Sequence, residues 1–214
     1  MKYRWSLAPA QPALAGHLGQ QCSISPLLAQ CLLNRGISEA GAVREFLEPR
    51  LKDLRDPFLI PNMAPAVERL FAAHARRENI VIFGDYDVDG VSSTALLLEV
   101  LSRLGWKAQP YLPHRMDEGY GLSREGVTNC LEKFTADLLL AVDCGSTAGE
   151  TIRWLQEKRI DVIVLDHHQV SEPPPAAVAL VNPQLAADGR PSFRELCSAG
   201  LAFKLAHALV KRGR

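Results

Sequence analysis

The chain has 214 residues, of which 47% are hydrophobic, and its 24 basic and 24 acidic residues give a formal net charge of zero. This length allows one full hydrophobic core or somewhat more, and the balanced charge gives no support for a large basic surface that binds nucleic acid. No apolar run could span a bilayer and the five cysteines include no C-x-x-C pair, so we expect a cytoplasmic protein with reduced thiols and no membrane partner.

Residues 1–79 are predicted to form a helical N-terminal region. Ser25, followed by a proline, is typical of the N-cap and first turn of a helix over 26–33. A second short helix is expected over 38–47, and a third over 63–77, where apolar residues recur at helical spacing. No residue in this region indicates chemistry, so we interpret it as a packing element or an accessory surface.

Residues 80–214 alternate between strand and helix patterns and are predicted to form one domain. Strands are expected over 80–84, 107–112, 137–142, 161–165 and 179–181, and helices over 91–104, 123–134, 147–158 and 198–211. The helix over 147–158 is predicted to begin with a capping box formed by Thr147 and Glu150. This alternation predicts an α/β fold, a doubly wound and mostly parallel sheet flanked by helices.

Three carboxylates follow the first of these strands at alternate positions, Asp85, Asp87 and Asp89, and Gly90 closes the group. Like charges packed beyond a strand end stay ionised most readily with cations among them, and oxygen ligands suit Mg²⁺ or Mn²⁺. The same pattern opens an EF-hand loop, but the twelfth position is Leu96 and a strand precedes the group. A solvated acidic turn without an ion stays open when the hexapeptide is taken alone.

Two further strands also end in groups that can bind a metal. Asp143 follows the strand over 137–142, and Asp166, His167 and His168 follow the strand over 161–165. Right-handed crossovers place the ends of parallel strands on one edge of a sheet, so we expect a shared site. So many ligands suit two ions about 3.5–4 Å apart, which polarise a phosphate and generate hydroxide from water. Asp143 is the natural bridge, and the imidazoles favour Mn²⁺ over Mg²⁺.

These residues resemble motifs I, II and III of the DHH phosphoesterase superfamily. Within that superfamily, the segments 83–90, 113–122 and 142–145 are similar to the RecJ family of single-strand-specific DNA exonucleases. The helical N-terminal region and the segment 197–204 are also similar, so the resemblance covers nearly the whole chain.

The resemblance implies a metal-ligand set. Asp87, Asp89, Asp143 and His167 would be direct ligands, with Asp143 bridging two Mn²⁺ or Mg²⁺ ions. Asp85 would be either a ligand or a residue in contact with one.

The resemblance also implies roles beside the metals. Asp166 would orient the histidines, as carboxylates next to metal ligands commonly do. His168 would contact the scissile phosphate or protonate the leaving group. Arg115 could neutralise a phosphate through a bidentate contact, although a plain surface arginine fits the sequence equally well.

The function that the resemblance implies is 5′-to-3′ hydrolysis of single-stranded DNA in recombination and repair. A single-stranded-DNA-binding protein and a helicase would be partners. Two alternatives stay open: another enzyme of the superfamily, acting on short oligoribonucleotides, cyclic dinucleotides or pyrophosphate, or a non-catalytic binding module that keeps the fold. The family's fourth motif and its second domain would lie beyond Arg214, so we expect the chain to be a fragment.

Overall fold

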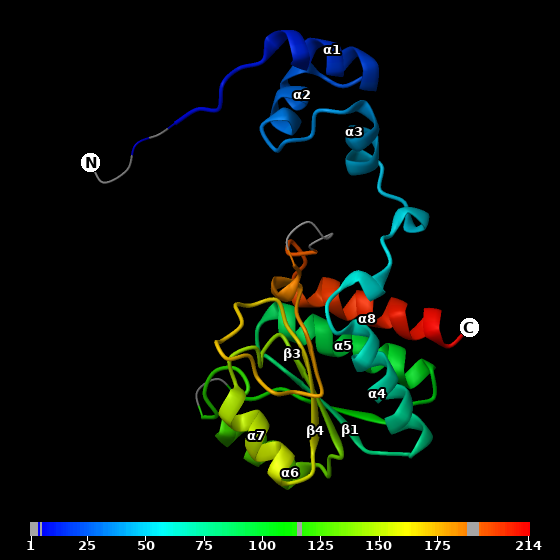
Figure 1. Cartoon of the computed structure of the whole chain (residues 1–214), viewed down its shortest axis with the longest axis vertical. Coiled ribbons are helices and arrows are strands. Elements are labelled where there is room, and N and C mark those ends of the chain that lie inside the picture. The colour runs from blue at the N-terminus through cyan, green and yellow to red at the C-terminus, as the bar shows by residue number, and fades with distance from the viewer. Residues whose placement is uncertain (1–3, 5, 115–116, 188–192) are drawn as a thin grey trace. The chain divides into compact units, whose positions relative to one another are not determined.

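The computed structural model describes residues 4, 6–114, 117–187 and 193–214. The chain divides into two compact units, Met1–Arg55 and Asp56–Arg214 (Figure 1). Each unit has its own cluster of buried apolar side chains.

The first unit consists of short helices around a small apolar cluster. Its elements are α1 (Pro12–Cys22), α2 (Pro26–Leu33), α3 (Ala40–Leu47) and the 3-10 turn η1 (Leu51–Asp53). The Ser25 side chain accepts a hydrogen bond from the Leu28 N–H at 3.2 Å, so the predicted N-cap of α2 is confirmed. The cluster contains Leu18, Leu32 and Val43 from the three helices.

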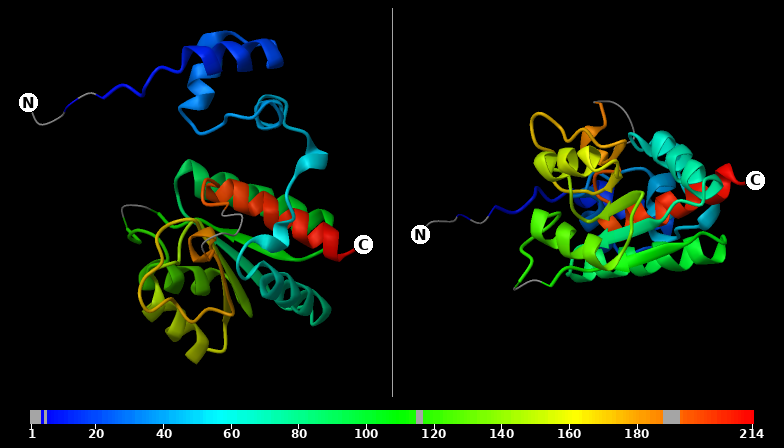
Figure 2. Two further views of the ribbon diagram at one scale, coloured as in Figure 1. Left: turned by 45° about the horizontal axis from the view of Figure 1, so that its top comes forward. Right: turned by 90° about the horizontal axis from the view of Figure 1, so that it is seen from below.

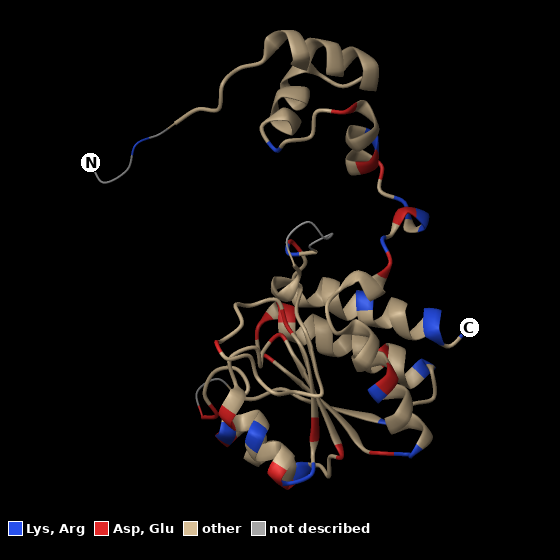
Figure 3. Ribbon diagram, viewed as in Figure 1, with Lys and Arg blue, Asp and Glu red and all other residues tan. Residues whose placement is uncertain are grey.

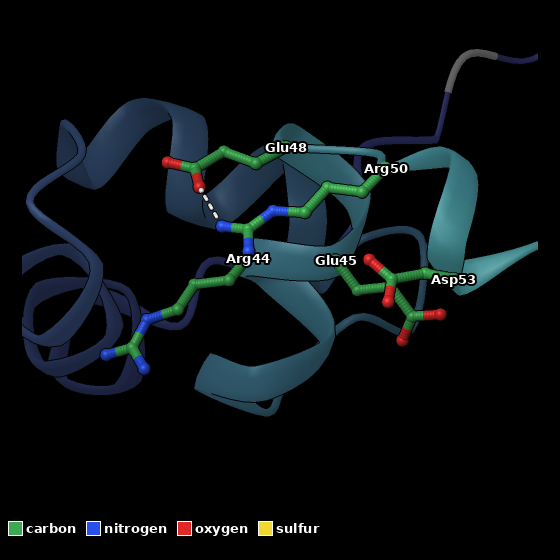
Figure 4. Close-up of a pocket in the computed structure, with 5 residues that line it drawn as sticks. All are labelled: Arg44, Glu45, Glu48, Arg50 and Asp53. Carbon is green, nitrogen blue, oxygen red and sulfur yellow. Dashed lines mark hydrogen bonds and ion pairs between the residues drawn. The ribbon is translucent and has the colours of Figure 1, made fainter.

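A surface hollow of about 480 Å³ in this unit is lined by side chains of both signs, from Arg44, Glu45, Glu48, Arg50 and Asp53 (Figure 4). Arg50 Nη2 lies 3.5 Å from Glu48 Oε2, and both side chains are more than half exposed. An exposed ion pair of this kind contributes little to stability. The hollow therefore provides no basis for a reactive site.

The second unit is built on a parallel sheet, as predicted. In the described part of the chain the sheet has five strands, in the order β2-β1-β3-β4-β5, and all neighbouring pairs are parallel. The strands are β1 (Ile80–Gly84), β2 (Ala108–Tyr111), β3 (Leu138–Val142), β4 (Asp161–Leu165) and β5 (Ala179–Val181). The predicted doubly wound α/β fold is confirmed.

Helices cover both faces of the sheet, because successive residues of its buried strands point to opposite faces (Figures 1 and 2). Ile80 and Ile82 pack on one side with α4 (Met63–Ala75), α5 (Val88–Arg103) and α8 (Ser198–Arg212). Val81 and Phe83 pack on the other with α6 (Arg124–Lys133) and α7 (Gly149–Glu157). The remaining elements are the 3-10 turns η2 (Pro57–Leu59) and η3 (Pro183–Leu185). Within the described ranges, no helix combines the length and the apolar content that crossing a membrane requires.

The structure differs from the sequence predictions at several boundaries. The compact units divide after residue 55, rather than after 79, because the apolar face of α4 lies in the core beside the sheet. Helix α5 begins at Val88, three residues before the predicted start. The predicted capping box was wrong: Ala148 is the N-cap of α7, and no side chain caps this helix. Helix α1 was not predicted.

Candidate metal centre

The centre lies where three adjacent strands end. The register pairs Gly84 with Val142 and Val142 with Leu165, so the three residues that follow, Asp85, Asp143 and Asp166, emerge side by side. Each of these aspartates extends the sheet by one further bond. The Asp85 N–H donates to the Val142 carbonyl, that of Asp143 to Leu165, and that of Asp166 to Val181, at 3.3, 3.0 and 3.1 Å.

The strand order places this edge at a topological switch point. The chain crosses to opposite sides of the sheet after β1 and β3, which leaves a crevice beyond their carboxyl ends, the usual ligand site of such sheets. Asp85 and Asp87 lie at the end of β1, and Asp143 lies at the end of β3. In Figure 3, Asp and Glu gather near this end of the sheet, whereas Lys and Arg lie mainly on the outer helices.

The turn from β1 into α5 fixes the first two carboxylates. Asp87 is the N-cap of α5, and its Oδ1 accepts the N–H groups of Asp89 and Gly90 at 2.9 and 3.1 Å. The Gly90 N–H is the main reason that the pKa of Asp87 is lowered. Burial instead raises the pKa of Asp85, and the charge of Asp87 adds to this effect. A side chain at Gly90 would collide with the Asp85 backbone, so the sharp turn requires glycine.

Asp143 combines an unfavourable backbone conformation with burial of its carboxylate. Its backbone has φ = 62°, in the left-handed region that non-glycine residues rarely adopt, and only 2% of its surface is exposed. Burial raises its pKa to about 7, and the charges of Asp89 and Asp87 also favour the protonated form. Among the described residues, its buried Oδ1 has no hydrogen-bond partner.

Asp143 is shared by two groups of ligand atoms. One group is Asp85, Asp87 and Asp143, the other is Asp143, His167 and His168, and within each group the ligand atoms lie within 4.8 Å of one another. A buried carboxylate oxygen without a partner, between carboxylates on one side and imidazoles on the other, suits a bridging ligand for two cations. The residues present therefore fit a pair of divalent ions.

Asp89 lies beside these groups and is held by a distant helix. Its Oδ2 accepts the Ser198 N–H and its Oδ1 accepts the Ala199 N–H, both at 2.8 Å, in the first turn of α8. Its Oδ2 also lies 3.6 Å from His167 Nε2, which lies 3.5 Å from Asp143 Oδ1. These two separations are long for hydrogen bonds. His167 therefore lies near the carboxylates of Asp89 and Asp143, and Asp89 is hydrogen-bonded to α8.

Asp166 holds the double-histidine segment in place. Its Oδ1 accepts the His167 N–H at 2.8 Å and lies 2.7 Å from His168 Nδ1, and its Oδ2 accepts the Ser146 N–H at 3.1 Å. Burial opposes the charge of Asp166, but these bonds keep its pKa below the usual range. Burial alone would lower the pKa of His168, yet the bond to Asp166 and the charges of Asp166, Asp143 and Asp85 raise it. Asp166 therefore orients the ring of His168 directly, and contacts His167 through its backbone.

The sequence analysis missed one residue that supports this segment. Asn182, which follows β5, is fully buried, and its Nδ2 donates to the Ser146 hydroxyl and to the His168 carbonyl, both at 2.8 Å. The sequence did contain a signal for this residue, because Asn182 and the proline after it follow a predicted strand whose end lies on the same edge of the sheet. Arg115, by contrast, was predicted to contact a phosphate and lies outside the described residues.

A family comparison supports the motif assignment. The model of the DHH family, N-terminal domain, matches residues 79–214.

Two of the proteins to which this chain is similar are bacterial exonucleases. The chain is 36% identical to the single-stranded-DNA-specific exonuclease RecJ of Bacillus subtilis over 209 residues, which cover 98% of this chain and 26% of that protein. It is 35% identical to RecJ of Escherichia coli over 187 residues, which cover 87% and 31% of the two chains. The chain thus spans about a quarter to a third of the length of these relatives.

Solved structures of RecJ proteins are similar to this chain in fold. The manganese complex of RecJ from Thermus thermophilus is 31% identical and superimposes with a TM-score of 0.75, covering 96% of this chain and 28% of that one. A second manganese-bound exonuclease RecJ is 38% identical with a TM-score of 0.64, covering 72% and 38%.

Proposed function

This chain belongs to the DHH family, and on that premise we propose that it carries the metal centre of a manganese-dependent exonuclease that hydrolyses phosphodiester bonds of single-stranded DNA from the 5′ end. One observation supports this proposal above the others. Asp143, buried and with an oxygen that accepts no hydrogen bond from the described residues, joins a carboxylate group and an imidazole group at the switch point of the sheet.

Asp85, Asp87, Asp143 and His167 are the proposed ligands that already converge. Asp89 completes the set, since the Oδ2 that accepts a bond from α8 is also the oxygen nearest to His167. Divalent cations held there supply Lewis-acid polarisation of the phosphate ester and favour attack by water. Manganese is the proposed ion because imidazole ligands accompany the carboxylates, and two similar RecJ structures contain it.

His168 is the proposed residue for contact with the scissile phosphate and for proton transfer to the leaving oxygen. Its Nδ1 is engaged by Asp166, so only Nε2 is left for the substrate side. The charges of Asp166 and its neighbours raise the pKa of His168 and so favour the protonated ring, which can donate from Nε2. Asp166 has the supporting role of fixing that ring.

The substrate is proposed from the named relatives, whose names give them as specific for single-stranded DNA. Because the chain spans a minor part of those proteins, the activity of the whole protein is part of the proposal. A role in recombination and repair, the protein partners implied by the resemblance, and a cytoplasmic location stay predictions.

The metal site is tested by comparing two aspartates at opposite ends of the same strand. Asp143 follows β3 at the proposed centre, whereas Asp137 precedes it and accepts bonds from Asn79 at the other edge. Loss of a residue that merely supports a ligand costs about 10–100-fold in metal affinity, so Asp143→Asn should weaken Mn²⁺ binding by at least that factor. Asp137→Asn should leave it unchanged. Isothermal titration with Mn²⁺ measures both, and equal binding by the two variants would refute the bridged site.

The substrate is tested with labelled DNA in the presence of Mn²⁺. The expected result is release of nucleotides from the 5′ end of a single strand and little release from a blunt duplex. Hydrolysis of dinucleotides or pyrophosphate in preference to long single strands would favour another enzyme of the superfamily. Metal binding and DNA binding with no hydrolysis of any of these substrates would favour a binding module.

A further inference from the structure

A buried serine in the first turn of α8 has a hydroxyl that the packing of the helix does not explain. Ser198 is the first residue of α8 and is fully buried, whereas the N-cap position belongs to Cys197. Among the described residues, the Ser198 hydroxyl has no hydrogen-bond partner. A buried polar group without a partner destabilises a folded protein, and alanine at the same position would avoid that cost. A role in packing alone therefore does not account for a serine here.

The position of Ser198 is fixed by the packing of α8 on the rest of its unit. Leu201, Leu205 and Leu209 lie on the buried face of the helix and belong to the large apolar cluster on one side of the sheet. The helix also lies alongside α5, which carries Asp89 (Figures 1 and 2). The apolar core thus holds the first turn of α8 beside the carboxyl ends of the strands.

Ser198 lies next to the acidic residues of the metal centre. Its N–H donates to Asp89 Oδ2 at 2.8 Å. That oxygen lies 3.6 Å from His167 Nε2, which in turn lies 3.5 Å from Asp143 Oδ1. Asp143 Oδ1, like the Ser198 hydroxyl, is buried and has no hydrogen-bond partner among the described residues. A hydroxyl that can donate and a carboxylate oxygen that can accept are therefore both unpaired in this part of the centre.

The hydroxyl of Ser198 already acts on the carboxylate of Asp143. Burial raises the pKa of Asp143, and the nearby side chain of Ser198 lowers it by favouring the charged form. A hydroxyl carries no net charge, so it has this effect only at short range and when its O–H is directed at the carboxylate. The contact does not meet the geometry of an ordinary hydrogen bond. Such bonds at functional sites are often long or poorly aligned before the ligand is bound, and they shorten afterwards.

We propose that Ser198 is a positioning residue of the metal centre, and that its hydroxyl donates a hydrogen bond to the Asp143 carboxylate when divalent cations are bound. The inference rests on the proposed function and specifies what orients the bridging ligand. Carboxylates that bind metals are commonly held by a hydrogen bond from a neighbouring group. A carboxylate has about four lone-pair sites, so Asp143 can bridge two ions and still accept this bond. Ser198 then fixes two ligands at once, Asp89 through its N–H and Asp143 through its hydroxyl.

The test compares the loss of two buried hydroxyls. Ser198→Ala removes the hydroxyl and leaves the N–H bond to Asp89 in place. Thr94→Val is the matched control, because the Thr94 hydroxyl on α5 is also buried and also lacks a partner among the described residues. Isothermal titration should give a Kd for Mn²⁺ about 10–100-fold higher for Ser198→Ala than for wild type, and an unchanged Kd for Thr94→Val. Urea unfolding in EDTA checks that both variants are folded.

A second measurement reports the bridge itself. Two Mn²⁺ ions that share a carboxylate are spin-coupled, and their electron paramagnetic resonance spectrum differs from the hyperfine pattern of an isolated ion. With two equivalents of Mn²⁺, wild type and Thr94→Val should give the coupled spectrum. Ser198→Ala should show a larger share of uncoupled Mn²⁺, which the loss of a hydroxyl with only a structural role would not produce.

The outcomes separate the role of Ser198 from the proposed function. If Ser198→Ala is folded and binds Mn²⁺ as wild type does, the positioning role is refuted while the metal centre stands. Equal weakening by both variants, or loss of folding by Ser198→Ala, would assign the hydroxyl a structural role and overturn the inference. If wild type binds no Mn²⁺, the metal centre fails and the positioning role fails with it. Because the titration needs no substrate, it decides the role of Ser198 even if the chain hydrolyses no DNA.

Discussion

At the scale of single residues, Asp143 shows that the centre is arranged for function at the expense of stability. A left-handed backbone at a non-glycine residue costs about 1–3 kcal/mol, and this residue also combines burial with neighbouring like charges. This backbone conformation persists because the surrounding sheet holds Asp143 in place, through the bond from its N–H to the Leu165 carbonyl. Perturbed titration at a buried carboxylate in a cleft is typical of functional sites.

We therefore expect Asp143→Asn to stabilise the metal-free chain. The pKa of Asp143 is about 7 in the folded protein, against about 3.9 for an unperturbed aspartate. A raised folded pKa of an acid means that stability is greatest below the unfolded value and is lost as the pH rises from about 4 through 7. The variant should gain about 1–3 kcal/mol in the free energy of unfolding at pH 8 and nothing at pH 4. Urea unfolding in EDTA at both pH values measures this, with Asp137→Asn as control. A loss of stability at pH 8 would contradict the assignment.

The cysteines should divide sharply in reactivity. Cys31 and Cys197 are exposed, whereas Cys130 and Cys144 are buried. Burial, assisted by Glu118, raises the pKa of Cys130 to about 12, and burial also raises that of Cys144. Because the thiolate is the reactive form, a disulfide reagent at pH 8 should modify Cys31 and Cys197 quickly and the buried pair only after denaturant is added. Mass spectrometry of peptides gives the sites, and rapid labelling of Cys144 in the folded chain would contradict the packing at the end of β3.

At the scale of elements, the strands and their carboxylate ends were predictable, but the contacts between elements were not. Runs such as Ile80–Gly84 are too apolar and β-branched to be surface loops, and parallel topology then places their ends together. Predictions from local sequence patterns failed where the interacting residue is distant in the chain, or where glycine and proline interrupt a helical pattern. Helix α1 contains both glycine and proline. The capping box predicted at Thr147 was wrong because the helix begins one residue later, with Ala148 as its N-cap. The hydrogen bonds that Asp89 accepts from α8 join residues more than 100 positions apart in the sequence. No local sequence pattern could therefore predict them.

Those bonds predict that the first turn of α8 depends on Asp89 for its stability. The N-cap position of this helix is Cys197, whose side chain makes no capping bond, so Asp89 satisfies the N–H groups of Ser198 and Ala199 in its place. Removal of a capping side chain costs about 0.5–2 kcal/mol. Asp89→Ala should therefore destabilise the chain by this amount and speed hydrogen exchange in the first turn of α8.

The control for that experiment is Ser123→Ala, which removes the cap of α6 instead. It should cost a similar free energy and leave exchange in α8 unchanged. Both variants are measured without metal, so that the loss of a bound ion does not contribute to the change in stability. Unaltered exchange in α8 of Asp89→Ala would show that the contact does not hold the helix.

At the scale of the whole molecule, the site belongs to one compact unit. Every described residue that converges on the metal centre, from Asp85 to Ala199, lies within Asp56–Arg214. That unit has two extensive apolar clusters, one on each face of the sheet. The described cluster of the first unit contains six buried residues, which is a small core for a unit of about 55 residues.

Residues 56–214 should therefore fold and bind metal without the first unit. Because the two large clusters and all the converging ligands are retained, we expect a cooperative thermal transition and Mn²⁺ affinity within about threefold of the full chain, as is usual for an independent domain. Circular dichroism and isothermal titration measure the two properties. Residues 1–55 alone provide the comparison, and their small core predicts a weak or absent transition. If the larger piece folded cooperatively yet bound Mn²⁺ far more weakly, ligands outside the sheet unit would be required, and the assignment of the complete site to the strand ends would be wrong.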